Sequence, residues 1–96
     1  MYSTTNEIDL RSFYLEFLTR TGCHLCDEAL PVVHRVARLT GASVREVQVE
    51  SDDDLLRQFD LRIPVIREPR GRVLAEGIIE FRPLLRSAVA ARLRRR

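Results

Sequence analysis

The hydrophobic pattern in the first half of the chain constrains the fold most strongly, because its period changes twice. Phe13–Leu18 alternates in hydrophobicity and is rich in aromatic residues, which is typical of a central strand. From about Cys23 to Leu39 the apolar residues fall at helical spacing, and Gly41 supplies a stop signal. Residues 44–50 then alternate again. Two strands joined by a helix of this length predict a right-handed βαβ unit with parallel strands.

The second half of the chain predicts a short helix, a hairpin and a final helix. Ser51–Asp54 precedes an apolar stretch, and its three aspartates favour a helix cap over a metal site. Two short apolar runs, Ile63–Ile66 and Val73–Ala75, flank a type I turn at Glu68–Gly71, which indicates an antiparallel hairpin. Glu80–Arg96 predicts a helix whose apolar face holds Leu84, Leu85, Ala88, Val89 and Leu93. The predicted order is βαβαββα, an α/β fold with one four-stranded sheet and helices on its faces.

The length and composition predict one small domain. Residues 12–96 form it, and residues 1–11 are expected to be a poorly ordered lead-in. The N-terminus carries Glu7 and Asp9 and lacks a basic region followed by an apolar stretch, so no signal peptide is expected. No apolar run is long enough to span a membrane, and a cytoplasmic location follows as the expectation.

The charge gives only weak grounds for a nucleic-acid partner, and none is predicted. The formal net charge is only +2, and all sixteen basic residues are arginines. The arginines that end the chain are expected to complement the C-terminal dipole of the last helix.

Both cysteines of the chain form one C-x-x-C pair, Cys23 and Cys26. In a reducing compartment such a pair is more often redox-active or metal-binding than structural. Cys23 lies where the first strand has ended and a helix begins, so the unpaired N–H groups and the helix dipole should lower its pKa below the ordinary value of about 8.5. Arg20, and His24 when protonated, would act in the same direction and are predicted to tune the thiolate. Cys26 lies one turn further on, within reach of a disulfide, so Cys23 is predicted to attack a substrate disulfide and Cys26 to resolve the intermediate.

A metal site is the main alternative for the cysteine pair. The remaining soft ligands are His24, which flanks the pair, and His34, two turns along the helix and expected on the surface. A structural zinc site usually takes four ligands, commonly with a second pair, and no second pair exists here. No metal site within one chain is therefore predicted, whereas a cluster shared across a dimer and a pair of inert thiols stay open.

The order of these motifs resembles a known family. The first strand leads into GCHLCDEA, I-P-V begins the third strand at Ile63, and Gly77 precedes the last helix. This order is similar to the thioredoxin fold in its minimal glutaredoxin form, and to small bacterial glutaredoxin-like proteins with a G-C-H-L-C-D-E-A motif. The resemblance implies a mixed four-stranded sheet, a cis Pro64 beside the disulfide, and backbone hydrogen bonds from Ile63 to an extended substrate. It also implies a substrate-binding turn at Gly77.

Two departures from the family pattern concern the substrate. Glutaredoxins typically carry C-P-Y-C, whereas His24 and Leu25 separate the cysteines here. The glutathione-binding G-G-x-D turn has the form G-I-I-E at residues 77–80, without its second glycine and its aspartate. Glu80 is expected to cap the last helix rather than to bind an amine.

The predicted function is a monomeric, cytoplasmic thiol–disulfide oxidoreductase that reduces protein or low-molecular-weight disulfides. It needs no resident cofactor and takes electrons from a reductase or a low-molecular-weight thiol, with glutathione as a candidate. Two alternatives stay open: a metal or iron–sulfur carrier that uses Cys23, and a non-catalytic binding module that uses the groove beside Pro64.

Overall fold

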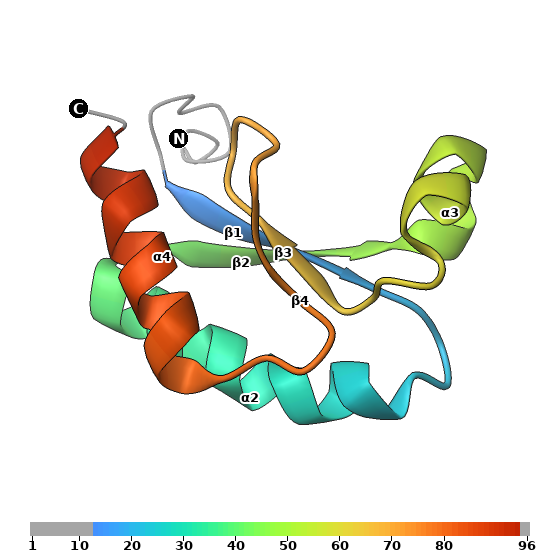
Figure 1. Cartoon of the computed structure of the whole chain (residues 1–96), viewed down its shortest axis with the longest axis horizontal. Helices are drawn as coiled ribbons and strands as arrows, with labels where there is room; N and C mark the ends of the chain where they lie inside the picture. Colours follow the sequence, from blue (N-terminus) through green and yellow to red (C-terminus); the bar gives the residue numbers. More distant parts are fainter. Residues whose placement is uncertain (1–12, 95–96) are drawn as a thin grey trace, which may run out of the picture.

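The computed structural model describes residues 13–94 of the chain, so the predicted lead-in, residues 1–11, lies outside the described residues. Strands and helices alternate through this part (Figure 1). In chain order they are β1 (Tyr14–Thr19), α2 (His24–Thr40), β2 (Ser43–Gln48), the 3-10 turn η1 (Val49–Ser51), α3 (Asp53–Phe59), β3 (Val65–Arg67), β4 (Val73–Glu76) and α4 (Phe81–Arg94).

The four strands form one mixed sheet in the order β2-β1-β3-β4. β1 and β2 are parallel, with Leu15 opposite Val44 and Leu18 opposite Val47. β3 runs antiparallel to β1 and to β4. The predicted βαβ unit, the hairpin and the α/β fold with a four-stranded mixed sheet are therefore confirmed.

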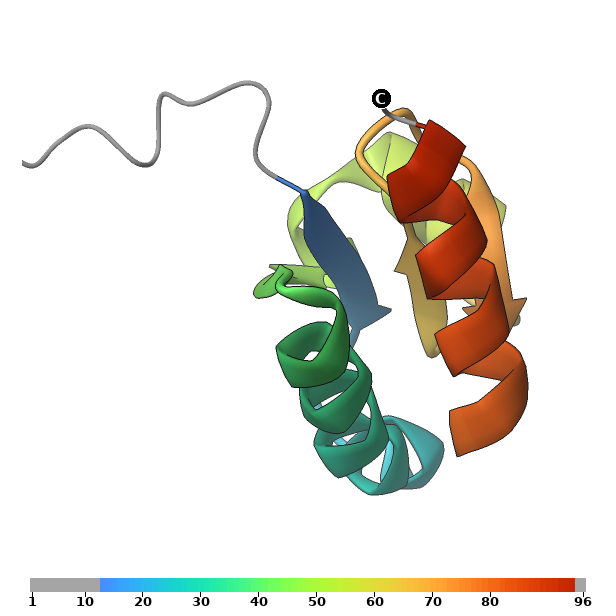
Figure 2. The same ribbon diagram turned by 90° about the vertical axis from the view of Figure 1, so that its left-hand side faces the viewer.

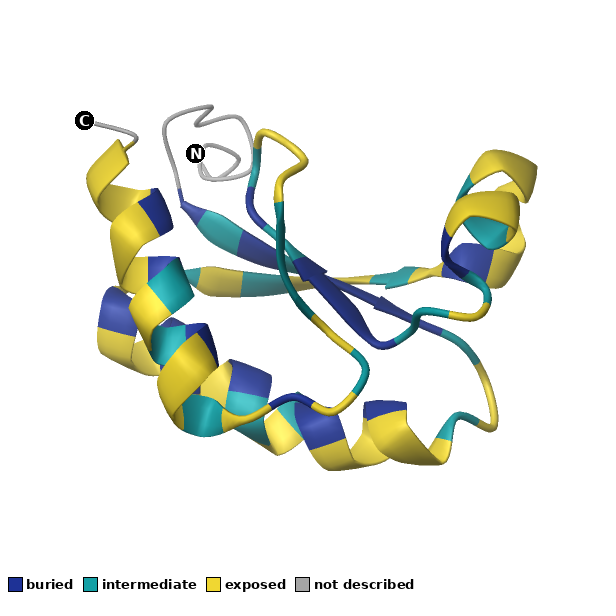
Figure 3. Cartoon of the chain, in the orientation of Figure 1, coloured by how far each residue is buried: buried dark blue, intermediate teal, exposed yellow. Residues whose placement is uncertain are grey.

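The helices cover the two faces of the sheet unequally. α2 and α4 lie beside each other on one face, and α3 lies on the other side at one end (Figures 1 and 2). The larger core fills the space under α2 and α4 and takes Leu15 and Phe17 from β1. A smaller core under α3 consists of Leu18, Val49, Phe59 and Val65. β1 and β3 are consequently the most deeply buried strands (Figure 3).

The boundaries of α2 follow from local signals in the sequence. Gly41 adopts a left-handed conformation with φ 71°, and its N–H reaches the carbonyls of Ala37 and Arg38. This C-cap satisfies carbonyls that the helix leaves without partners. Pro31 lies inside the helix, which continues on both sides of it.

The aspartates before α3 cap that helix, as predicted. Asp52 is the N-cap, and its carboxylate accepts hydrogen bonds from the N–H groups of Asp54 and Leu55 at 2.8 and 3.2 Å. Asp53 and Asp54 occupy the first turn, where negative charge suits the dipole.

The buried face of α4 matches the predicted one at Leu84 and Ala88 and differs from it toward the C-terminus. The helix buries Leu84, Ala88 and Ala91, whereas Val89 and Leu93 are exposed. Both sets of residues have helical spacing, so the sequence period alone could not separate them. The packing of α4 against α2 and β4 decides which set is buried. None of the helices between residues 13 and 94 combines the length and apolarity needed to cross a membrane.

The β3–β4 hairpin turns around a buried carboxylate. The N–H of Gly71 donates to the carbonyl of Glu68 at 2.8 Å, which closes the predicted turn. The Glu68 side chain accepts from the N–H groups of Arg70 and Arg72, both at 3.1 Å, although the residue is only 5% exposed. The carboxylate thus satisfies two backbone donors of the turn.

We expect Glu68→Ala to destabilise the protein by about 1–3 kcal/mol, because two backbone N–H groups would lose their acceptor beside a buried site. Urea unfolding followed by circular dichroism measures the change. Glu46→Ala, at an exposed position of β2, is the matched control and should change the stability by less than about 0.5 kcal/mol. Equal midpoints for the two variants would contradict this role of Glu68.

Candidate active site

The two cysteines lie at the junction between β1 and α2. Gly22, with φ 79°, turns the chain after the strand, and Cys23 is the N-cap of the helix. Cys23 and Cys26 are joined in a disulfide, with their Cα atoms 5.2 Å apart. The Sγ of Cys23 also accepts a hydrogen bond from the N–H of Cys26 at 3.1 Å. The structure therefore brings the predicted pair together at a helix N-terminus, where a backbone donor faces the first sulfur.

The two cysteines differ in exposure. Cys26 is 2% exposed and belongs to the main hydrophobic core. Cys23 is only partly buried and packs against the edge of that core. A reactant from solvent can thus approach Cys23, while the protein shields Cys26.

The residues between the cysteines face outward. His24 Nε2 lies 2.6 Å from Glu28 Oε2, one turn along α2, and both side chains are largely exposed. Leu25 is also exposed. The predicted tuning residue His24 therefore lies next to Cys23 in the chain, with a carboxylate as its direct partner.

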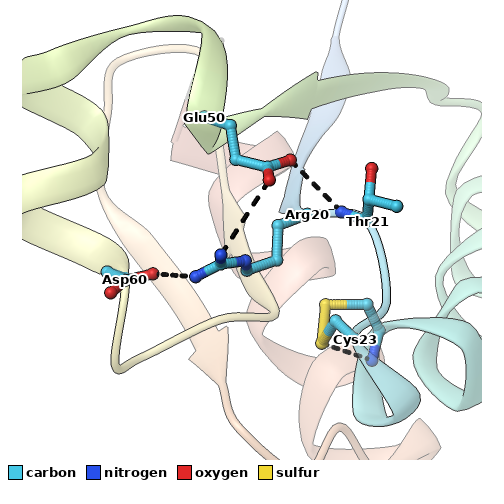
Figure 4. Close-up of a disulfide and its surroundings, with 6 residues drawn as sticks. Arg20, Thr21, Cys23, Glu50 and Asp60 are labelled. Atoms are coloured by element: carbon cyan, nitrogen blue, oxygen red, sulfur yellow. Dashed lines mark hydrogen bonds and ion pairs between the residues drawn. A yellow bond between two sulfur atoms is a disulfide. The ribbon is translucent and has the colours of Figure 1, made fainter.

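Arg20, the second predicted tuning residue, lies between two carboxylates. Its guanidinium forms an ion pair with Asp60 and reaches Glu50 at 3.9 Å, as Figure 4 shows. The N–H of Thr21 also donates to Glu50, at 3.3 Å. These contacts connect the loop before Cys23 to η1 and to the end of α3. Glu50 and Asp60 were not predicted as part of the site, since nothing in the sequence connects them to a loop about thirty and forty residues earlier.

The predicted substrate-binding residues meet near the same end of the sheet. The Ile63–Pro64 peptide bond is cis, and Pro64 is buried. The N–H of Gly77 donates to the carbonyl of Pro64 at 2.9 Å. The N–H of Ile63 donates to the carbonyl of Phe59 at 3.1 Å, and the Ile63 side chain packs against the same core as Cys23. The loop before β3, which carries Ile63 and Pro64, is thus bonded to the loop after β4, which begins at Gly77. Both loops lie at the end of the sheet where α2 begins (Figure 1).

A further ion pair joins these two loops. Arg62 donates to Glu76 Oε1 from Nε at 3.0 Å and from the terminal nitrogen at 2.6 Å. The hydrogen bond to Glu76 raises the pKa of Arg62 above its ordinary value. The Arg62 guanidinium is therefore paired with the Glu76 carboxylate. Within residues 13–94, no group of three or more His, Cys, Asp or Glu side chains is placed to hold a metal ion.

Comparisons with known proteins agree with this arrangement. The glutaredoxin-like domain family (DUF836) matches residues 14–82. The structure is similar to that of the structural genomics target protein XcR50 from X. campestris, with a TM-score of 0.63 and 32% sequence identity, covering 80% of this chain and 96% of that one. None of the curated proteins matches the chain.

Two more distant structures share the fold alone. Protein Ne2328 from Nitrosomonas europaea gives a TM-score of 0.64 at 18% identity, with 83% of this chain and 89% of that one covered. A malarial protein gives 0.61 at 15% identity, with coverages of 85% and 98%.

The difference in exposure predicts the order of chemical modification. After reduction, iodoacetamide should alkylate Cys23 at least about tenfold faster than Cys26, since reactivity follows thiolate character and access. Trypsin releases both cysteines in one peptide, residues 21–35, and tandem mass spectrometry locates the label. In denaturant the two rates should converge. Equal labelling of both cysteines in the folded protein would contradict the assignment.

Proposed function

The chain belongs to the glutaredoxin-like domain family, and on that premise we propose that it is a thiol–disulfide oxidoreductase. It reduces protein or low-molecular-weight disulfides through Cys23 and Cys26. The observation that carries this proposal is the disulfide at the start of α2, which joins a partly exposed cysteine to a buried one. A purely structural disulfide would have no need for an accessible sulfur at a helix N-terminus.

The reaction begins from the reduced pair. The thiolate of Cys23 attacks one sulfur of the substrate disulfide, which forms a mixed disulfide and releases the first substrate thiolate. The thiolate of Cys26 then attacks Cys23, forms the Cys23–Cys26 disulfide and releases the second substrate thiolate. Two electrons pass from the cysteine pair to the substrate, and the released thiolates take up protons. An external thiol or a reductase then restores the reduced pair.

The position of Cys23 supports its role as the attacking residue. The N–H of Cys26 donates to the Sγ of Cys23 at 3.1 Å, and this donor favours a negative charge on the Cys23 sulfur. The helix dipole acts in the same direction, because Cys23 is the N-cap of a helix of 17 residues. Both effects stabilise a thiolate without a neighbouring general base.

Ile63, Pro64 and Gly77 are proposed to hold the substrate beside the cysteines. The N–H of Ile63 is already bonded to Phe59, so its carbonyl is the group that would accept a hydrogen bond from an extended substrate. The bond between Gly77 and Pro64 fixes the two loops relative to each other. A rigid pair of loops beside the partly buried Cys23 suits a substrate that binds across the surface.

The setting of the reaction is part of the proposal. A reducing compartment such as the cytoplasm would keep the pair able to donate electrons. The protein would act as a monomer without a resident cofactor, and its electrons would come from a reductase or a low-molecular-weight thiol. The proposed disulfide reduction can be tested without knowing the electron donor, because the reduced cysteine pair itself carries two electrons.

Cysteine substitutions test the proposal directly. Cys23→Ser should abolish reduction of an insulin disulfide by the pre-reduced protein in a single turnover, because the attacking sulfur is absent. Cys26→Ser should accumulate a mixed disulfide at Cys23, seen as a mass increase that dithiothreitol reverses. If Cys23→Ser kept the wild-type rate, the proposal would be refuted.

We further propose that His24 tunes the pair, since its protonated form would place a positive charge beside the Cys23 thiolate. Glu28, at 2.6 Å, offsets part of that charge, so the effect should be small. His24→Asn should lower the reduction potential by about 10–30 mV. His34→Asn, at an exposed position of α2, is the matched control and should leave the potential unchanged. Identical potentials for His24→Asn and the parent protein would remove His24 from this role.

A further inference from the structure

Three exposed apolar side chains lie on the segments that surround the disulfide. Leu25, between the two cysteines, is 39% exposed, Leu61 is 97% exposed and Ile78 is 75% exposed. These three are half of the six large apolar side chains that are exposed among residues 13–94. Exposed apolar side chains that gather at one place, rather than singly, mark a contact surface.

The contacts of the loops show that these three segments lie together. Leu61 follows Asp60, which forms an ion pair with Arg20 at the start of the loop that leads to Cys23. Ile78 follows Gly77, whose N–H is bonded to the carbonyl of Pro64. In Figure 1 the start of α2, the loop that follows α3 and the loop that follows β4 lie at the same end of the sheet. We call Leu25, Leu61 and Ile78 the apolar rim.

Charge is distributed unevenly between this end and the rest of the molecule. The segments 20–28, 50–62 and 76–82 make up the active-site end, and they hold nine carboxylates and four arginines, a formal charge of −5. The other described residues hold three carboxylates and nine arginines, a formal charge of +6. The weakly basic chain therefore concentrates its carboxylates in the segments of the active-site end.

The arginines at the active-site end are largely committed to partners within it. Arg20 pairs with Asp60 and Glu50, and Arg62 pairs with Glu76. Arg57 pairs with Asp54. In contrast, Asp27 and Glu80 are exposed and form no ion pair within residues 13–94. The fourth arginine, Arg82, is exposed and forms no ion pair within residues 13–94. A bound cation thus finds more unpaired carboxylates at this end than a bound anion finds unpaired arginines.

From the apolar rim and this charge we propose a substrate class for the cysteine pair: disulfides in extended protein segments that carry apolar and basic side chains beside the cysteine. Anionic small disulfides, of which glutathione disulfide is an example, are poor substrates by the same reasoning. This inference rests on the proposed function and adds selectivity to it. The chemical step is the exchange described above, with both electrons supplied by the reduced pair.

The physical basis is electrostatic steering followed by apolar contact. Charges at the rim of a site change the rate of encounter more than the strength of the final complex, and salt weakens their effect. A surface of one sign can raise the encounter rate of an oppositely charged partner by about tenfold or more. The apolar rim then holds the segment while Cys23 attacks.

Two disulfide-linked peptides with a quenched fluorophore provide the test. They share the same apolar residues, and the cysteines are flanked by lysines in one and by glutamates in the other. The pre-reduced full-length protein reduces each in a single turnover at low and at high ionic strength. Each rate constant is divided by that of dithiothreitol with the same peptide, which removes the intrinsic effect of peptide charge on disulfide reactivity. Hydroxyethyl disulfide serves as the uncharged reference, and glutathione disulfide as the anionic one.

We expect the normalised rate for the lysine peptide to exceed that for the glutamate peptide by about tenfold at low ionic strength, and the ratio to approach one at high ionic strength. Asp27→Asn and Glu80→Gln should each lower the ratio by about two- to threefold at low ionic strength. Glu46→Gln removes the same charge outside the active-site end and should leave the ratio unchanged.

The apolar rim has its own matched pair of variants. Leu61→Ser should slow both peptides by about three- to tenfold and leave hydroxyethyl disulfide unaffected. Leu39→Ser, at the exposed C-terminal end of α2, should slow neither peptide. Both leucines are exposed, so neither change removes a core contact.

The outcomes separate the two levels of the proposal. Reduction of hydroxyethyl disulfide with equal normalised rates for both peptides would overturn the substrate class and leave the oxidoreductase standing. A glutathione disulfide rate above that of the lysine peptide would overturn it as well. Failure of the pre-reduced protein to reduce any of the four disulfides would overturn the proposed function and, with it, this inference.

Discussion

The burial of β1 on both faces is the constraint on which the rest of the structure depends. Leu15 and Phe17 enter the core under α2 and α4, while Leu18 enters the core under α3. Because successive side chains of a strand point to opposite faces, one short strand fixes the sheet relative to helices on both sides. The strand ends at Thr19, and the chain has only four residues before α2 begins. The position of Cys23 is therefore set by the most deeply buried element of the fold.

The active-site end is held together by a small number of long-range contacts. Arg20 connects the loop before Cys23 to Glu50 and Asp60, and Arg62 connects the loop before Pro64 to Glu76. These ion pairs are partly exposed, so each contributes little to global stability. Their effect is local: they fix loops that carry no regular secondary structure and would otherwise be positioned by their ends alone.

These contacts also determine the electrostatic character of the site. An arginine near a cysteine suggests a cation that stabilises a thiolate, yet Arg20 is occupied by two carboxylates. The stabilisation of the thiolate is then left to the N–H of Cys26 and to the dipole of α2. Three of the four arginines at the active-site end are paired, and its nine carboxylates outnumber them. This excess of carboxylates is the basis of the proposed preference for a cationic, apolar substrate over an anionic one.

The sequence by itself determined the elements, their order and the cysteine pair. Alternation in β1, helical spacing in α2 and the stop at Gly41 are local signals, and the cap at Asp52 depends on residues two and three positions away. The sequence did not determine which stripe of α4 is buried, because Ala91 and Leu93 both satisfy a helical period and only the packing against α2 separates them. It also could not assign partners to Arg20, since Glu50 and Asp60 reach it only when the sheet and α3 are assembled. Short-range hydrogen bonds can be predicted because their partners are neighbours in the sequence. The exposure of each cysteine and the net charge around the pair depend instead on distant segments, which only the tertiary structure brings together.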